Sequence, residues 1–384
     1  MSVSPSSPLS HLLSATESLS SAFLLIQLPG QPIEYWECHS WMEAERISDL
    51  EGEEGFIFAP FSSRRGHAIY LLRPEKVSVL DPQDFSSHVT KNPPLAQEIT
   101  SMPEHEPPPS LYRSRFEIFH SAVTCGQFSK LVLSRYECYP LSCDCSAMDL
   151  FVRLLNLESS GTKYFLFIPK LGCWLGATPE ILLQSSAAGS SVMALAGTKP
   201  STDCTPLQDA ATIFGSKNVR EHQIVVEHLH DILKAEGFPV LDETQTILSS
   251  YAVGHLCTRI KFGLSGKGRL SKLVERLHPT PAICGSPADE TEVFINENEG
   301  YERSYYAGYL GYWHYEGKTD LYVNLRSASI SSENKGEVIA CLYAGGGIMP
   351  DSDCETEWQE TRLKIQLMRT LFAPFSSPQS THPR

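Results

Sequence analysis

Acidic side chains stand in two segments that are predicted to be helical, and carboxylate oxygens of this kind bind hard divalent cations. Near the C-terminus, Glu357 and Glu360 are three residues apart and so share one helical face, with Lys364 one turn after Glu360. An earlier apolar segment carries Glu221 and Glu227. Taken alone, each segment is better explained as a solvated charged helix face, with Glu360 and Lys364 as an i,i+4 ion pair. The spacing therefore permits a metal site without requiring one.

Three other charged residues lie inside apolar segments that read as strands. Lys130 opens the run KLVLSRYECYPL, Glu180 lies in GATPEILL, and Arg326 lies in YVNLRSAS. A single buried charge costs several kcal/mol unless another group compensates it. Arg326 therefore either points outward or anchors a ligand.

A glycine-rich segment, AGGGIMP at residues 344–350, ends another strand. Such a segment often forms a tight turn or bulge with positive φ. Alternatively, its backbone N–H groups can approach an anion closely. It is not a dinucleotide fingerprint, because the G-x-G-x-x-G spacing is absent. The sequence also contains no Ser-His-Asp or Cys-His signature and no histidine pair at metal-ligand spacing.

The elements that must position these residues are mostly strands. Short apolar runs separated by turns predict strands between Ala22 and about Asp81. Further strands alternate irregularly with helices, the clearest helices being 111–125 and 216–235, and Asp353 can cap a last helix. Strands that follow strands favour an α+β fold with antiparallel sheets over a doubly wound one.

Charge and composition exclude several classes of partner. The formal net charge is -14 and no Lys/Arg stripe is present, which argues against nucleic acid and against an anionic membrane. No apolar run approaches the roughly 20 residues needed to span a bilayer, and the first basic residue is Arg46, which does not fit a signal peptide. Eleven scattered cysteines without a C-x-x-C pair predict reduced thiols in the cytoplasm, and zinc at Cys143 and Cys145 is disfavoured.

Eight blocks taken in order carry much more information than any one of them. They are KLVLSR, GATPEILL, LAGT, KNVREHQIVVEHL, HPTPAICGSP, YYAGYLGYW, LRSASI and YAGGGIMPDSDCETEWQETRLK. Between about Leu111 and Leu371 the chain resembles the chorismate-utilising enzymes, which include isochorismate synthase, salicylate synthase, anthranilate synthase component I and aminodeoxychorismate synthase component I. The resemblance implies an α+β fold in which two large antiparallel β-sheets sandwich the active site, with helices outside.

Particular positions favour one branch of this family. At the position of Lys130 the ammonia-using members of the family typically have Gln. By this resemblance, Lys130 implies attack by water and no glutamine amidotransferase subunit. Ala196 replaces the nucleophilic Lys typical of aminodeoxychorismate synthase. Ala282 and Ile283 are more similar to isochorismate synthase than to salicylate synthase, which stays the alternative within enzymes. A non-catalytic chorismate-binding subunit is the alternative from another class. Asn218 departs from the family, which often has an acid there.

The resemblance also implies roles for site residues. Lys130 is the expected base that activates water, and Glu180 the acid that protonates the departing hydroxyl. Each role requires a pKa shifted toward neutrality, as burial produces. Glu221 and Glu360 are expected to hold Mg²⁺ directly, and Glu357 directly or through water. The expected substrate contacts are Gly197, Thr198, His255, Ala282, Ile283, Tyr306, Arg326, Gly345, Gly347 and Lys364. Among these, Arg326 and the two glycines would hold the enolpyruvyl carboxylate, and Lys364 the ring carboxylate.

These inferences together predict a Mg²⁺-dependent isochorismate synthase that adds water at C2 of chorismate and expels the C4 hydroxyl reversibly. Its product would enter menaquinone or siderophore biosynthesis, and a monomer is expected. The predicted organisation is a flexible N-terminus at 1–20, a β-rich part completing the sheets at 21–110, a chorismate-binding catalytic region at 111–372 and a disordered tail at 373–384.

Overall fold

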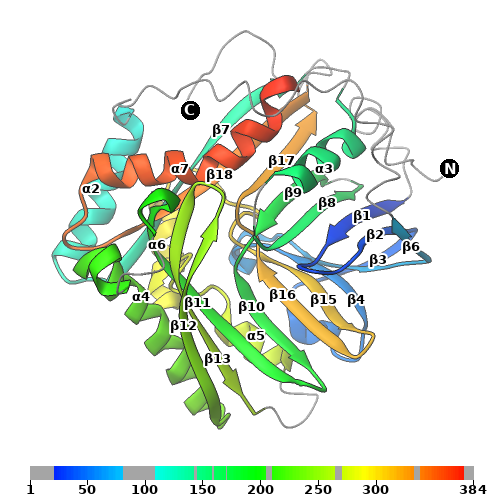
Figure 1. The fold of residues 1–384 in the computed structure, drawn as a ribbon, viewed down its shortest axis with the longest axis horizontal. Coiled ribbons are helices and arrows are strands. Elements are labelled where there is room, and N and C mark those ends of the chain that lie inside the picture. Colours follow the sequence, from blue (N-terminus) through cyan, green and yellow to red (C-terminus); the bar gives the residue numbers. More distant parts are fainter. Residues whose placement is uncertain are drawn as a thin grey trace.

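Two β-sheets with helices on their outer sides form the molecule (Figure 1). The structure is a computed structural model that describes residues 21–80, 109–141, 145–157, 160–169, 171–204, 210–263, 270–332 and 338–375. The predicted flexible N-terminus at 1–20, residues 376–384 of the predicted tail, and Cys143 lie outside the described residues. All strand pairings within the described residues are antiparallel, so the predicted α+β class is confirmed.

The first sheet carries the predicted strand at Lys130 and the glycine-rich segment. Its strand order is β14 (Gly285–Ser286), β7 (Lys130–Leu141), β18 (Val338–Ile348), β17 (Ser327–Ser332), β9 (Gly172–Thr178), β8 (Thr162–Ile168), β1 (Ala22–Gln27), β2 (Ile33–Cys38) and β6 (Lys76–Leu80). The register of β7 and β18 pairs Gly345 with Ser134 and Gly347 with Val132. The glycine-rich segment therefore lies in the sheet beside the N-terminal residues of β7.

The second sheet is built from the middle of the chain and from N-terminal strands. Its order is β12 (Val240–Ser250), β13 (Val253–Phe262), β11 (Gly189–Pro200), β10 (Ile181–Ser186), β16 (Lys318–Val323), β15 (Tyr309–Tyr315), β4 (Gly55–Ala59), β5 (Ile69–Arg73) and β3 (Ser40–Ala44). Strands from residues 21–80 thus extend one end of each sheet. The boundaries of the predicted domains stay a prediction.

The helices cover the outer faces of the sheets (Figure 1). They are α2 (Ser110–Thr124), α3 (Ala147–Asn156), α4 (Ala210–Ala235), α5 (Leu270–Leu277), α6 (Ala288–Asn298) and α7 (Cys354–Phe372), with short 3₁₀ turns η1 (Ile47–Leu50), η2 (Ser63–Arg65), η4 (Ser201–Asp203) and η6 (Ala373–Phe375). Asp353 caps α7 by accepting from the Thr356 backbone N–H at 3.0 Å, as predicted. None of the described helices is long and apolar enough to cross a membrane.

Two features differ from the sequence-based expectations. Helix α4 begins at Ala210, before the predicted start, because a kink at Gly215 with φ of 73° joins a short N-terminal piece to the long periodic part. Cys138 and Cys341 form a disulfide between directly paired residues of β7 and β18. The expectation of reduced thiols is therefore wrong for this pair, which is 203 residues apart in sequence and only adjacent once the two strands pair.

Candidate active site

A pocket with about 650 Å³ of space, including its opening to solvent, lies where strands of both sheets meet helices α4 and α7. Many of the predicted site residues line it. They are Glu180, Gly197, Thr198, Glu221, His255, Ala282, Ile283, Tyr306, Arg326, Gly345, Gly347 and Lys364. Lys130, Glu357 and Glu360 are absent from this lining but contact residues that belong to it. The fold thus brings together segments that are far apart in the sequence.

Lys130, the first residue of β7, is completely buried. Its Nζ lies 3.0 Å from Glu221 Oε1 on α4. Burial alone would raise the pKa of Glu221, but Lys130, Lys217 and Lys364 outweigh it and lower that pKa to about 2. A Cβ on Gly347 would lie only 2.1 Å from Glu221 Oε1, so this position has to be glycine for the carboxylate to reach Lys130.

Glu180 lies between β9 and β10 and is 2% exposed. Its Oε1 is buried and has no hydrogen-bond partner among the described residues. Burial raises the pKa of Glu180 to about 8, although Lys130, Lys364 and Arg326 oppose this shift. The carboxyl group is therefore protonated near neutral pH, which is the form that a general acid needs.

A chain of hydrogen bonds runs through Thr198, His255 and Arg326. The Arg326 Nη2 group donates to His255 Nε2 at 2.7 Å. Burial, and after it Arg326 and Lys364, lower the pKa of His255 well below its ordinary value, so the ring is neutral. Its proton then resides on Nδ1, which donates to Thr198 Oγ1 at 3.3 Å. This arrangement fixes both the tautomer of His255 and the direction of Arg326.

Arg326 combines several features of an anion anchor. It is 7% exposed and adopts a left-handed conformation with φ of 48°, which costs energy in a non-glycine residue and is concentrated at ligand-binding positions. Burial lowers its pKa to about 10, although the charges of Tyr306, Glu360 and Glu180 oppose this shift. The guanidinium is thus a desolvated cation that a carboxylate ligand would stabilise.

The other cation of the pocket is Lys364 on α7. Its Nζ donates to the Gly345 carbonyl at 2.9 Å and to Glu360 Oε1 at 2.6 Å. The i,i+4 ion pair that the spacing of Glu360 and Lys364 predicted is therefore present, and it lies at the pocket instead of on a solvated face.

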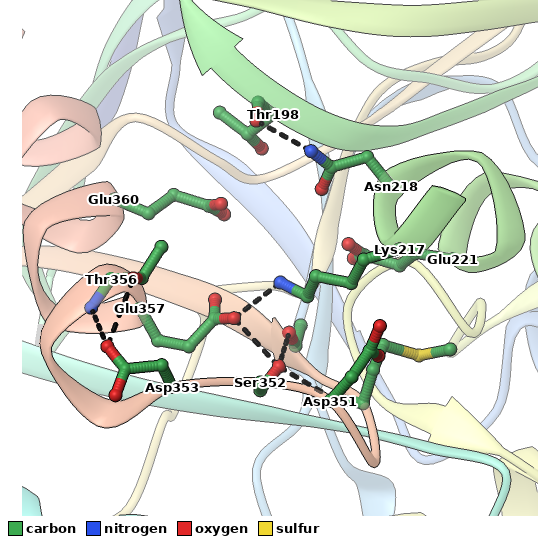
Figure 2. A network of polar contacts seen from close by, with 12 residues as sticks. Thr198, Lys217, Asn218, Glu221, Asp351, Ser352, Asp353, Thr356, Glu357 and Glu360 are labelled. Carbon is green, nitrogen blue, oxygen red and sulfur yellow. Dashed lines mark hydrogen bonds and ion pairs between the residues drawn. The ribbon is translucent and has the colours of Figure 1, made fainter. Parts of the chain in front are cut away.

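The charges of all three predicted metal ligands act on the ammonium group of Lys217. Figure 2 shows Lys217 reaching from α4 toward Glu357 on α7, with the Glu360 carboxylate facing the same space. Lys217 forms an ion pair with Glu357. Burial would lower the pKa of Lys217, but Glu221, Glu357 and Glu360 together raise it. In addition, Ser352 Oγ donates to Glu357 Oε1 at 2.7 Å. Of the three carboxylates, Glu357 is thus paired with Lys217, while Glu221 is paired with Lys130 and Glu360 with Lys364.

This carboxylate cluster has the donor chemistry that a divalent cation requires. Glu357 Oε2 is buried without a hydrogen-bond partner among the described residues. A Cβ on Gly346 would lie 3.5 Å from this oxygen and 3.7 Å from Glu360 Oε1, so both oxygens face the same glycine. However, no three His, Cys, Asp or Glu side chains of the described residues converge as a bound ion would require. The residues fit Mg²⁺ by charge and donor type, and the metal assignment stays a prediction.

Sequence reasoning did not single out Arg303 and Glu299, which form a buried bidentate ion pair at the pocket. Arg303 donates to Glu299 at 2.6 and 2.7 Å, to the Val132 carbonyl at 2.8 Å and to the Ile283 carbonyl at 2.7 Å. Glu299 also accepts from the Ser134 backbone N–H at 2.6 Å. The pair therefore ties β7 to the loop that carries Ile283. Its only sequence signal is a charged residue just before the aromatic block YYAGYLGYW.

Asn218 packs against the pocket wall at Gly197. Its Nδ2 donates to the carbonyls of Thr198 at 3.3 Å and Phe214 at 2.9 Å, the first of which Figure 2 shows. Gly197 has φ of 74°, and a Cβ there would lie 2.8 Å from the Asn218 carbonyl oxygen. Glycine at this bulge of β11 therefore lets the strand approach α4 closely.

Comparison with known proteins gives this geometry a family. A model of the chorismate binding enzymes matches residues 75–373. The salicylate biosynthesis isochorismate synthase of Pseudomonas aeruginosa is 33% identical over 255 residues, which are 65% of this chain and 52% of that protein. The chain thus spans about half the length of this curated relative.

Solved structures share the fold. MenF, the menaquinone-specific isochorismate synthase from Escherichia coli, aligns with a TM-score of 0.67 at 23% identity, over 94% of this chain and 91% of that one. Anthranilate synthase component I from Streptococcus pneumoniae aligns with a TM-score of 0.62 at 17% identity, over 90% and 89%. This chain therefore belongs to the family of chorismate-binding enzymes, in the branch of the isochorismate synthases.

Proposed function

We propose that this protein isomerises chorismate to isochorismate. The observation that carries the proposal is the buried carboxyl group of Glu180, which lines one pocket together with the cations Arg326 and Lys364. A dianionic substrate needs such cations in a protein of net charge -14. A leaving hydroxyl group needs an acid of this kind.

The reaction exchanges one allylic alcohol for another. Water attacks C2 of the ring and gives a proton to the neutral amine form of Lys130, the ring double bonds shift, and the C4 hydroxyl leaves with a proton from Glu180 as water. One water molecule enters and one departs, so no redox cofactor or ammonia is needed. The proton on Lys130 must return to Glu180 before the next turnover. A general base acting on the attacking water and a general acid acting on the leaving hydroxyl each contribute substantially to the rate.

The remaining pocket residues hold the substrate. Arg326, oriented by His255, and the backbone of Gly345 and Gly347 would bind the enolpyruvyl carboxylate. Lys364 would bind the ring carboxylate. Tyr306 stacks on Tyr343 with ring centroids 5.1 Å apart and closes one wall. These contacts orient the ring relative to the acid and the base.

Mg²⁺ would be held by Glu221 and Glu360, with Glu357 directly or through water. Bound there, the ion would neutralise the ring carboxylate and make C2 more electrophilic. Lys217 already balances part of the negative charge of these three carboxylates. Its ammonium group would have to give way to an entering ion.

The direct test is to incubate the purified protein with chorismate, with and without EDTA, and to identify the product by chromatography. Isochorismate is expected without EDTA and a much slower reaction with it. Salicylate, which is fluorescent, would show that pyruvate is eliminated as well. Recovery of unchanged chorismate from a protein that binds it would instead identify a non-catalytic chorismate-binding subunit and would overturn the proposal.

Glu360→Ala is expected to weaken Mg²⁺ binding by about tenfold or more, as loss of a metal-site carboxylate typically does. Calorimetric titration with Mg²⁺ measures this independently of turnover. Glu355→Ala is the matched control, because Glu355 lies on the same helix and contacts Gln359 instead of the cluster. Equal Mg²⁺ affinity in both variants would remove Glu360 from the metal site. The consuming pathway, a cytoplasmic location and a monomeric state stay predictions.

A further inference from the structure

A disulfide joins the two strands of the first sheet that carry Lys130 and the glycine-rich segment. Cys138 of β7 and Cys341 of β18 are direct partners in the register of these strands. The other cysteines of the described residues are free. In compartments that are kept reducing, disulfides are uncommon, and those present are usually catalytic or redox-sensing. The reaction proposed above uses no thiol, so the chemistry of the site leaves this bond without a role.

The disulfide lies in a partly exposed part of the β7–β18 ladder. Cys138 and Cys341 are half-buried, and so are their neighbours Tyr139, Pro140 and Ile339. Most of the free cysteines of the described residues are buried instead. Thiol–disulfide exchange requires an attacking thiolate to reach one of the two sulfur atoms. A small dithiol can therefore attack this bond while the sheet stays folded.

The disulfide also shares a sheet face with the pocket wall. Side chains of a strand alternate between the two faces of a sheet, so every second residue points the same way. The residues of β18 that follow Cys341 on its face all line the active-site pocket, and they are Tyr343, Gly345 and Gly347. On β7 the same alternation leads from Cys138 to Lys130. The bond therefore lies on the face that the site uses.

Tyr343 connects the disulfide to the substrate pocket. Its direct partner is Tyr136, the residue next to Cys138 on this face, and the two ring centroids are 6.1 Å apart. Tyr343 also stacks on Tyr306, with centroids 5.1 Å apart, and on Trp174, with centroids 5.7 Å apart. Cross-strand pairs of this kind depend on the spacing of the two strands. A change in that spacing at the disulfide therefore moves a ring that packs against a proposed substrate contact.

We propose that the Cys138–Cys341 disulfide is a redox switch that sets the affinity of the active site for chorismate. In the oxidised form the bond fixes the spacing of β7 and β18 beside Tyr343. A dithiol reductant breaks the S–S bond: its two thiols give two electrons and two protons to the cysteines, and the reductant becomes a disulfide itself. The freed strands gain mobility, which has to be lost again when chorismate binds. The reduced form therefore has the lower affinity.

The chemistry is tested on the full chain with dithiothreitol, a small dithiol. The protein is first oxidised with glutathione disulfide, then treated with dithiothreitol and freed of it. The number of thiols titrated in denaturant is expected to rise by two per chain, and not to rise in the double variant Cys138→Ser, Cys341→Ser. An unchanged number in wild-type protein that stays folded by circular dichroism would overturn the switch.

The effect on the site has its own measurement. The dissociation constant of chorismate, measured calorimetrically, is expected to rise about fivefold on reduction. The double variant should bind chorismate as reduced wild type does, with and without dithiothreitol. Cys125→Ser removes an exposed free thiol and is the control, which should respond to dithiothreitol as wild type does. An unchanged dissociation constant in fully reduced wild type would overturn the switch.

A second measurement needs neither chorismate nor a variant. Amide hydrogen exchange of residues 343–348 is expected to be faster in reduced wild type than in oxidised wild type, because the freed strands open more often. The affinity measurement rests on the proposed function, whereas hydrogen exchange and thiol titration do not. If chorismate binds neither form, the proposed function fails and hydrogen exchange decides the switch. Equal exchange in the two forms would then overturn it.

Discussion

Replacement of Lys130 by alanine is expected to lower kcat about a thousandfold while chorismate still binds. A positioned general base contributes roughly 10²–10⁴ to the rate of a reaction in which water must be deprotonated. Lys130 is completely buried and its only charged neighbour within 4.0 Å among the described residues is Glu221. None of the residues proposed to hold the two substrate carboxylates is changed. The rate of product formation at saturating chorismate gives kcat, and calorimetric titration with chorismate gives the affinity.

Two further variants separate chemistry from folding. Lys130→Met keeps most of the side-chain volume and should lose kcat to the same extent as the alanine variant. Lys163→Met is the matched control, because Lys163 is also buried in the same sheet but donates to the carbonyls of Leu155 and Leu157 at 2.9 Å, away from the pocket. It should lose stability and keep kcat. A near-normal kcat in either Lys130 variant would show that another group is the base.

The local pattern of the sequence is sufficient to predict the strand and the helix that carry the site residues. Strand β7 spans Lys130–Leu141, as the run KLVLSRYECYPL predicts, because apolar and aromatic residues of this kind are enriched in strands. Asp353 caps α7, and Glu360 pairs with Lys364 one turn later. These features depend on residues at most a few positions apart. They can therefore be inferred from spacing alone.

The contacts that give the site its electrostatics depend on the tertiary fold instead. Lys217 meets Glu357 from a helix 140 residues earlier, and no periodicity in either helix indicates that contact. Arg303 and Glu299 form an ordinary i,i+4 pair in sequence, yet they are buried because strand β7 and the loop at Ile283 close over them. The resemblance to a family supplied roles for the matching blocks, but it indicated neither of these arrangements.

Glu180→Gln is expected to lower kcat/KM by roughly 10²–10⁴ and to remove its dependence on pH above neutrality. In the wild-type protein the pKa of Glu180 without substrate is about 8, so kcat/KM should fall as pH rises through that value and the acid loses its proton. Glutamine occupies nearly the same volume but cannot protonate the C4 hydroxyl. A pH–rate profile of both proteins, from pH 6 to about 9.5, measures the effect. A wild-type kcat/KM that stays level across pH 8 would contradict the assignment of Glu180 as the acid.

The same substitution has a signature in stability that does not depend on turnover. A carboxyl group whose pKa rises from 4.5 to about 8 on folding stabilises the protein below pH 4.5, and this stabilisation is lost as pH rises toward 8. The free energy of unfolding of Glu180→Gln, relative to wild type, should therefore increase between pH 5 and 8.5 by on the order of 2–5 kcal/mol. Denaturant unfolding at several pH values measures it.

Glu137 provides the opposite control, because it is also buried but is paired with Arg135 and Arg369. Burial would raise its pKa, yet these arginines lower it to about 2, so its stabilising contribution is present above pH 4.5 and is lost as pH falls toward 2. Glu137→Gln should therefore destabilise the protein at pH 7 and leave the pH dependence of kcat unchanged. Opposite responses of these two buried carboxyl groups would show that the cations at the pocket do not hold Glu180 in its ionised form. The proton of Glu180 would then be available for transfer to a leaving hydroxyl.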